Sequence, residues 1–123
     1  MRKTALVVDD SPTMRQMVAF TLTNAGYTVV EAENGRDAVD KVAGRSKMDI
    51  VVTDLNMPEM DGITLIKELR KMEVFKFTPI LMLTTESTEA KKKAGKEAGA
   101  TGWIVKPFNP ELMLQVIAKV LPA

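Results

Sequence analysis

The sequence contains no cysteine and no histidine among its 123 residues. Without cysteine, the chain cannot form disulfides, use a thiolate nucleophile or bind zinc through sulfur. Without histidine, it lacks the usual general base and the commonest transition-metal ligand, and it cannot carry a phosphohistidine itself. Catalysis or metal binding must therefore depend on carboxylates, hydroxyls, amides and amines.

Neither a dominant charge nor a long hydrophobic run is present. The formal net charge of +1 gives no overall attraction for nucleic acid, so nucleic-acid binding is not expected. No apolar stretch approaches the roughly 18 residues that span a membrane, and Met1–Thr4 leads directly into a strand pattern. We therefore expect a cytoplasmic protein that does not bind membranes, with one domain over residues 1–123.

Short apolar runs alternate with helical patterns along the chain. Strands are predicted at Thr4–Val8, Thr28–Ala32, Ile50–Thr53, Pro79–Leu83 and Gly102–Val105. Helices are predicted from Pro12 to before Gly26, around Ala38–Val42, after Asp61 through Leu69, from Glu89 to Ala98, and from Pro110 to Val120. This alternation is typical of an α/β protein with a doubly wound, buried parallel sheet.

Two helices have apolar positions that define a predicted inner face. In the first helix these positions, which follow helical spacing, are Met14, Met17, Val18 and Leu22. In the fourth helix they are Ala90, Ala94 and Ala98, with Gly95 among them. A face made of such small residues buries little area, so we expect the fourth helix to be loosely held.

Polar side chains stand where the predicted strands end. Asp9 and Asp10 follow the first strand, Asp54 follows the third, Thr84 follows the fourth and Lys106 follows the fifth. Ligands of parallel α/β sheets collect at the carboxyl ends of the strands. Adjacent carboxylates repel unless a cation lies among them, and a lysine opposite them needs an anion. The pattern indicates Mg²⁺-dependent phosphoryl chemistry on a carboxylate. Any one of these residues alone would more often be a helix cap, a turn or a strand residue.

These five positions, with Lys106-Pro107-Phe108, resemble the receiver domain of bacterial two-component response regulators. Within that family the chain is most similar to single-domain chemotaxis regulators of the CheY type, and the resemblance covers essentially the whole chain. It implies a flavodoxin-like fold with five parallel strands in the order 2-1-3-4-5 and five strand–helix units.

The resemblance implies a magnesium site. Asp10 and Asp54 would bind Mg²⁺ directly, Asp9 would act mainly through a bound water, and the main-chain carbonyl of Asn56 would supply a further oxygen. Mg²⁺ prefers one or two carboxylates together with water and phosphate oxygens, so this set suits it.

The resemblance also assigns the phosphoryl chemistry. Asp54 would be the phosphoacceptor, forming an aspartyl phosphate. Lys106 would pair with phosphoryl oxygens, the Thr84 hydroxyl would donate to one of them, and the Lys106–Pro107 peptide bond would be cis. The protein would thus catalyse its own phosphorylation and autodephosphorylation without being a conventional enzyme. Asn56 and Glu86 would flank the path of the hydrolytic water, so we expect a short-lived phosphorylated state.

Signalling in the family transmits the added charge to a distant surface. Thr84 would move inward and Trp103 would then turn toward the space it leaves. Trp103 stands where tyrosine or phenylalanine is more familiar, and its larger ring with an N–H donor could turn inward less completely. The partner surface would include Lys91, Lys92, Lys96 and Trp103, although these lysines could equally form a solvated helix face.

The resemblance implies a histidine kinase as phosphodonor, a flagellar motor switch protein or another output protein as target, and in some systems a phosphatase. We expect a monomer. Motor control is favoured because no output domain follows Pro122-Ala123. A single-domain receiver in a phosphorelay outside chemotaxis remains open, as does an interaction module that works without phosphorylation.

Two further classes fit less well. A phosphatase of the haloacid dehalogenase type would need an aspartate in place of Ser11. A flavodoxin or nucleotide-binding protein would need a glycine-rich phosphate loop, whereas the first loop here is Asp9-Asp10-Ser11-Pro12-Thr13.

Overall fold

The computed structural model describes residues 3–43 and 48–121. The predicted lead from Met1 and the chain end at Pro122-Ala123 lie outside these residues. The elements are β1 (Thr4–Val8), α1 (Pro12–Asn24), β2 (Thr28–Ala32), α2 (Gly35–Val42), β3 (Ile50–Thr53), α3 (Gly62–Arg70), the 3-10 turn η1 (Glu73–Phe75), β4 (Ile80–Thr84), α4 (Glu89–Ala98), β5 (Gly102–Val105) and α5 (Pro110–Val120).

The sheet has five parallel strands in the predicted order, β2-β1-β3-β4-β5. Val8, the last residue of β1, lies beside Ala32 of β2 and beside Thr53 of β3. The carboxyl ends of β1 and β3 are therefore level with each other. This register places the residues that follow the two strands at one edge of the sheet.

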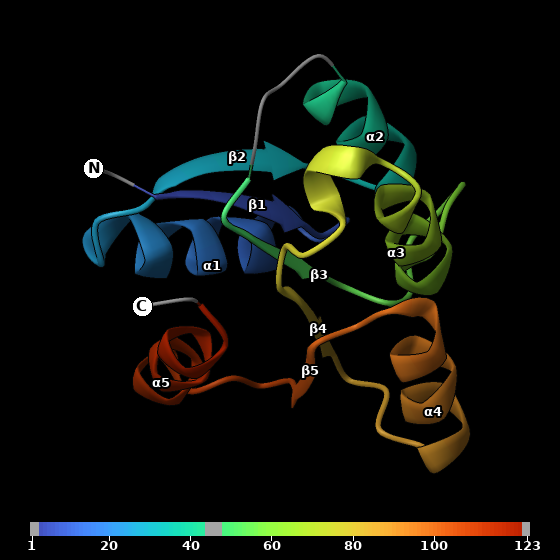
Figure 1. Cartoon of the computed structure of the whole chain (residues 1–123). Coiled ribbons are helices and arrows are strands. Elements are labelled where there is room, and N and C mark those ends of the chain that lie inside the picture. The colour runs from blue at the N-terminus through green and yellow to red at the C-terminus, as the bar shows by residue number, and fades with distance from the viewer. Residues whose placement is uncertain (1–2, 44–47, 122–123) are drawn as a thin grey trace.

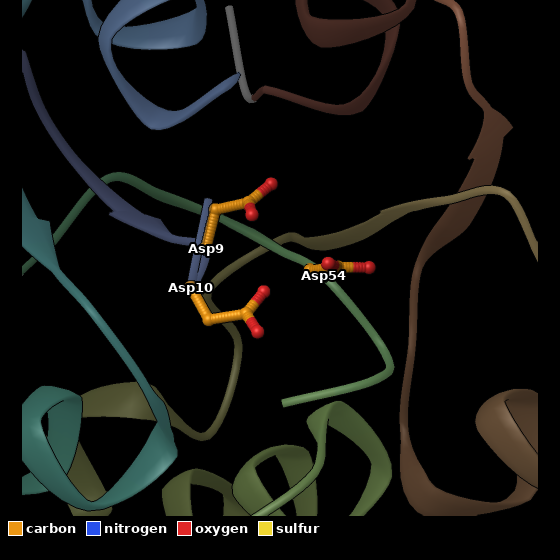
Figure 2. Close-up of side chains that lie close together, drawn as sticks. All are labelled: Asp9, Asp10 and Asp54. Carbon is orange, nitrogen blue, oxygen red and sulfur yellow. The ribbon is translucent and has the colours of Figure 1, made fainter. Parts of the chain in front are cut away.

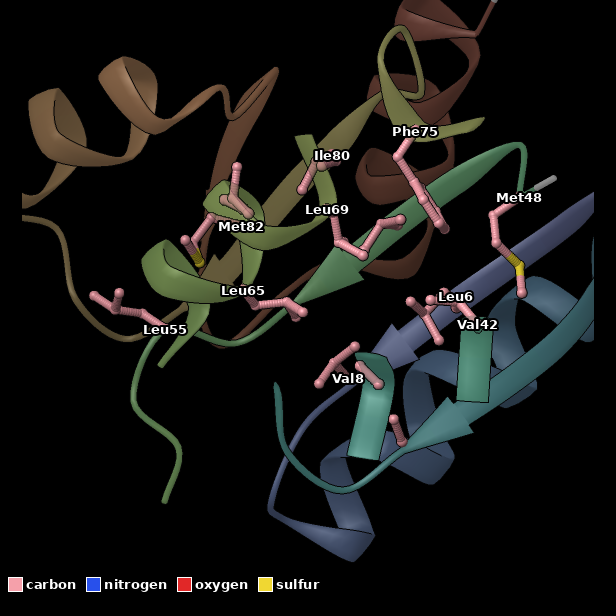
Figure 3. Close-up of a cluster of buried hydrophobic side chains, with 14 residues drawn as sticks. Leu6, Val8, Val42, Met48, Leu55, Leu65, Leu69, Phe75, Ile80 and Met82 are labelled. Atoms are coloured by element: carbon pink, nitrogen blue, oxygen red, sulfur yellow. The ribbon is translucent and has the colours of Figure 1, made fainter. Parts of the chain in front are cut away.

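The helices cover both faces of the sheet (Figure 1). On one face, α1 and α5 pack Val18, Leu22, Met113 and Ile117 against alternate strand residues. On the other face, α2 and α3 cover the remaining strand residues, and α4 lies beside α3 (Figures 1 and 3). Because strand side chains alternate between faces, a strand buried on both sides must be apolar throughout, as β1, β3 and β4 nearly are.

Polar side chains cap the starts of α1, α2 and α3. The Ser11 side chain accepts a hydrogen bond from the Met14 N–H, and Asp61 accepts from the Thr64 N–H at 2.8 Å. Asn34 caps α2 by accepting from the Asp37 N–H at 2.8 Å.

Four details of the fold differ from the prediction. β4 begins at Ile80 and includes Thr84, one residue later than predicted, and η1 was not predicted. Met17 is 49% exposed, so the inner face of α1 is formed by Val18, Ala19 and Leu22. Ala90 is exposed, whereas Gly95 is the buried residue of α4. Helical spacing alone did not show which side of each helix meets the sheet.

Arg70 joins the end of α3 to the end of α4. Its guanidinium donates to the carbonyls of Phe75 at 2.6 Å, Thr78 at 2.7 Å and Gly99 at 2.7 Å. Gly99 ends α4 in the left-handed conformation, which glycine adopts without steric cost. The last turn of α4 is therefore anchored to α3, although the helix buries few side chains of its own.

Over residues 3–43 and 48–121, no helix has both the length and the hydrophobicity needed to cross a bilayer.

Candidate functional site

Three carboxylates meet at the carboxyl ends of β1 and β3. Asp9 and Asp10 follow β1, Asp54 follows β3, and one carboxylate oxygen from each lies within 4.8 Å of the others (Figure 2). Asp9 and Asp54 are buried, whereas Asp10 is exposed. The register of the two strands thus brings together residues 45 positions apart in the sequence, as predicted.

Main-chain groups hold the two buried carboxylates. The Asp54 N–H donates to the Val8 carbonyl at 2.9 Å, which ties the start of the loop after β3 to the end of β1. The Asp54 Oδ1 accepts from the Leu55 N–H at 2.7 Å, and the Asp9 Oδ1 accepts from the Ser11 N–H at 2.9 Å. Each carboxylate therefore has a fixed direction and keeps its second oxygen for the centre of the site.

Lys106 occupies that centre. Its Nζ donates to Asp9 Oδ2 at 2.9 Å and to Asp54 Oδ2 at 3.3 Å, and its side chain is only 11% exposed. The Lys106 N–H donates to the Thr84 carbonyl at 2.9 Å, which positions the residue at the end of β5. The Lys106–Pro107 peptide bond is cis, as the resemblance implied. One ammonium thus balances two of the three acids.

Burial changes the proton affinity of these groups. Desolvation raises the pKa of Asp54 above its usual 3.8 and outweighs the lowering by the Lys106 charge; the nearby Asp9 raises it further. Burial lowers the pKa of Lys106, but hydrogen bonds and charges from Asp9 and Asp54 together outweigh burial and raise it. A buried, ionised Asp54 is therefore costly to the folded protein unless more positive charge approaches.

The raised pKa of Asp54 predicts a specific pH dependence of stability. An acid with a raised folded-state pKa costs nothing when both states are protonated below pH 3.8, and its cost grows as pH rises to the folded-state pKa. In metal-free buffer, Asp54→Asn should therefore gain stability relative to wild type as pH rises through this window. Urea unfolding of both proteins across the acidic range measures this, and a pH-independent difference would contradict it.

A second set of contacts links Thr84 to Trp103 through Glu86. The buried Thr84 accepts from the Glu86 N–H through Oγ1 at 3.3 Å. The Trp103 Nε1 donates to the Glu86 carbonyl at 2.8 Å. The indole donor therefore has a main-chain partner, and the half-buried ring packs against the core formed with α2 and α3. Sequence reasoning assigned Glu86 a side-chain role and missed this use of its carbonyl.

The two residues expected to flank a hydrolytic water differ from each other in their surroundings. Asn56 is exposed, two residues after Asp54. The Glu86 carboxylate accepts from the Thr88 N–H at 3.4 Å, at the residue that caps α4. Its carboxylate is therefore engaged at the start of α4.

The predicted partner surface is only partly continuous. Lys92, Lys96 and Trp103 line one pocket of about 270 Å³, whose other lining residues are Ala100, Thr101 and Gly102. Lys91 is exposed and does not line this pocket. The pocket combines two ammonium groups with one aromatic ring.

Gly62 is a site residue that the sequence did not reveal. Its N–H donates to the Leu55 carbonyl at 2.8 Å, and a Cβ at this position would overlap the main-chain carbonyl oxygen of Asp54. The first turn of α3 thus packs directly on the backbone of the residue proposed as acceptor.

The donor set fits Mg²⁺. It consists of carboxylate oxygens on two adjacent strand ends, one of them exposed to solvent, with no sulfur or imidazole. Hard cations with a water-rich coordination sphere suit such a set, and Mg²⁺ usually keeps several waters. Among residues 3–43 and 48–121, no hydrogen bond or ion pair to the Asp10 carboxylate competes with a cation.

Comparison with known proteins points in one direction. The sequence model of the response regulator receiver domain matches residues 5–118. Chemotaxis protein CheY1 of Helicobacter pylori is 43% identical over 94% of both chains. A CheY homolog of Campylobacter jejuni is 41% identical, covering 94% of this chain and 90% of its own. The crystal structure of Vibrio cholerae CheY4 superposes with a TM-score of 0.94 at 49% identity, covering 98% of this chain and all of that one.

Proposed function

This chain belongs to the response regulator receiver domain family, and on that basis we propose that it is a phosphorylation-activated switch in chemotaxis signalling. The observation that carries the proposal is the position of Asp54, which lies beside two further carboxylates and accepts a hydrogen bond from the ammonium of Lys106. No purely structural role explains this cluster of acids, because burying like charges costs stability.

Asp54 is proposed as the nucleophile. A carboxylate oxygen would attack the phosphorus of a phosphohistidine on the donor kinase, the N–P bond would break, and an acyl phosphate would form. In hydrolysis, water would attack the same phosphorus and release inorganic phosphate, which regenerates the carboxylate. The Lys106 Nζ, now 3.3 Å from Asp54, would pair with a phosphoryl oxygen while it keeps its bond to Asp9.

Asp10, Asp54 and the main-chain carbonyl of Asn56 would hold Mg²⁺, with Asp9 acting through a water. The ion supplies positive charge against the acids and the incoming phosphoryl group. Asp9 is suited to the indirect role because its Oδ2 already accepts from Lys106 and its Oδ1 from the Ser11 N–H.

The Thr84–Glu86–Trp103 contacts supply a route for the signal. If the Thr84 side chain moves toward the phosphoryl group and carries Oγ1 away from the Glu86 N–H, that hydrogen bond breaks, and the carbonyl of the same residue holds the Trp103 indole. A change at Asp54 would in this way alter the surface of α4, β5 and α5, including Lys91, Lys92 and Lys96. The short lifetime attributed to Asn56 and Glu86 stays a prediction, tested by the rate of phosphoryl loss.

The family implies a kinase that supplies the phosphoryl group and a target that reads it. We propose a flagellar motor switch protein as that target, a cytoplasmic location, a monomeric state and a single domain over residues 1–123. A direct binding measurement with and without beryllium fluoride, which mimics a phosphoryl group on a carboxylate, would test the target.

The fluorescence of Trp103, the only tryptophan, reports on the switch. In wild type we expect one change on adding Mg²⁺ and a second on adding beryllium fluoride. Asp54→Asn should lose the second change completely, because the amide cannot take the place of the acceptor carboxylate. A second change that persists in the variant would contradict the proposed function.

A further inference from the structure

The indole of Trp103 rests on the backbone of α4 at Gly95. A Cβ built on Gly95 would lie 2.7 Å from Cζ3 of Trp103, 3.4 Å from Cε3 and 3.7 Å from Cη2. All three atoms belong to the six-membered ring of the indole. The ring therefore occupies the space that any side chain at residue 95 would need.

Backbone conformation does not account for this glycine. Gly95 lies inside α4 and has no positive φ, unlike Gly26 and Gly99. In a helix interior, glycine disfavours the helix relative to alanine by about fivefold in the equilibrium constant. The neighbouring α4 residues are mostly alanine, lysine and glutamate, which are strong helix formers. What Gly95 provides at this position is space.

The ring is held at two places. Its Nε1 donates to the Glu86 carbonyl at 2.8 Å, and its six-membered ring lies on Gly95. A side chain at residue 95 would force a neighbouring group to move, and the indole can move more easily than the backbones of α4 and β5. Moving it would break the only hydrogen bond that the described residues offer to Nε1.

We infer that Gly95 is the positioning residue that admits the indole of Trp103 between α4 and β5, so that residue 95 sets the orientation of the ring. Any effect of this ring orientation on signalling rests on the proposed function, whereas the orientation itself does not. Because Trp103 lines the same pocket as Lys92 and Lys96, residue 95 also sets the aromatic part of that pocket without lining it.

The test is Gly95→Ala in the metal-free, unphosphorylated protein. The single tryptophan should emit at longer wavelength and be quenched more strongly by acrylamide, because the ring moves toward water. The matched control is Lys93→Ala on the exposed side of α4, which should leave both properties unchanged. Emission and quenching equal to wild type in Gly95→Ala would overturn the inference.

Stability provides a second measurement, in which Gly95→Ala should have opposite effects in wild type and in a Trp103→Ala background. In wild type, Gly95→Ala should lower the urea midpoint, although helix propensity alone would raise it. In a Trp103→Ala background the ring is absent, so the same substitution should raise the midpoint. The same sign in both backgrounds would overturn the inference. If Gly95→Ala alone does not fold, recovery of folding in the double variant supports it and failure of the double variant to fold contradicts it.

These results are separable from the proposed function. If beryllium fluoride causes no fluorescence change in wild type, the proposed switch is wrong, whereas the emission of Gly95→Ala would still decide the role of Gly95. Conversely, an unchanged Gly95→Ala spectrum with an intact wild-type response would remove only the inference.

Discussion

Lys106→Met is expected to destabilise the metal-free protein by about 3 to 5 kcal/mol, the usual cost of removing one partner of a buried ion pair. Among the described residues, this ammonium is the only cation paired with the carboxylates of Asp9 and Asp54, and both acids are buried. Without it, three carboxylates that each have one oxygen within 4.8 Å of the others would repel with no cation paired to the two buried ones.

Urea unfolding with a chelator measures this loss. Adding Mg²⁺ should recover more stability in Lys106→Met than in wild type, because a ligand that binds only the folded state stabilises it and the variant leaves the acids unopposed. The matched control is Lys96→Met on exposed α4, where the change should be within about 0.5 kcal/mol. Equal losses for the two lysines would contradict the central position given to Lys106.

Gly62→Ala is expected to destabilise the protein by about 3 kcal/mol and to disturb the acceptor site. The new methyl group would overlap the carbonyl oxygen of Asp54 and would also meet Leu55 Cα and the Met82 sulfur at 3.0 Å. Two of these neighbours are backbone, which cannot move without shifting β3 or the start of α3. The variant should therefore also bind Mg²⁺ less tightly.

Gly26→Ala is the comparison for this variant. Gly26 has a φ of 98° and no atom within 4 Å of a built Cβ, so alanine there meets only conformational strain of about 1 to 2 kcal/mol. It precedes the amino end of β2, whereas the acids lie at the carboxyl ends of β1 and β3. If Gly62→Ala is no more destabilising than Gly26→Ala and leaves Mg²⁺ affinity unchanged, the close packing of α3 on Asp54 is not as described.

The site residues that the sequence predicted share one property. Asp9, Asp10, Asp54 and Lys106 each follow a short apolar run, and parallel strands bring such positions to one edge of the sheet. Topology alone therefore places them together. The strand order followed from the family resemblance, and the structure confirmed it.

The residues that the sequence did not predict matter either because they leave room for a neighbouring group or because of their main-chain groups. Gly62 and Gly95 matter because another part of the chain occupies the space beside them, and Glu86 matters through its carbonyl. Neither kind of contact has a signature in residue type or spacing. The same limit explains why Ala90 and Met17 are exposed although they were predicted to face inward. Which side of a helix is buried depends on the elements packed against it as much as on its own residues.

We propose above all that Asp54 accepts a phosphoryl group in a Mg²⁺-dependent reaction. The most direct measurement is to incubate the protein with acetyl phosphate and Mg²⁺, reduce the acyl phosphate with borohydride, and locate the modified residue by mass spectrometry. We expect modification at Asp54 alone, and we expect a chelator to abolish it. Modification at Asp9 or Asp10, or none at Asp54 in the presence of Mg²⁺, would contradict it.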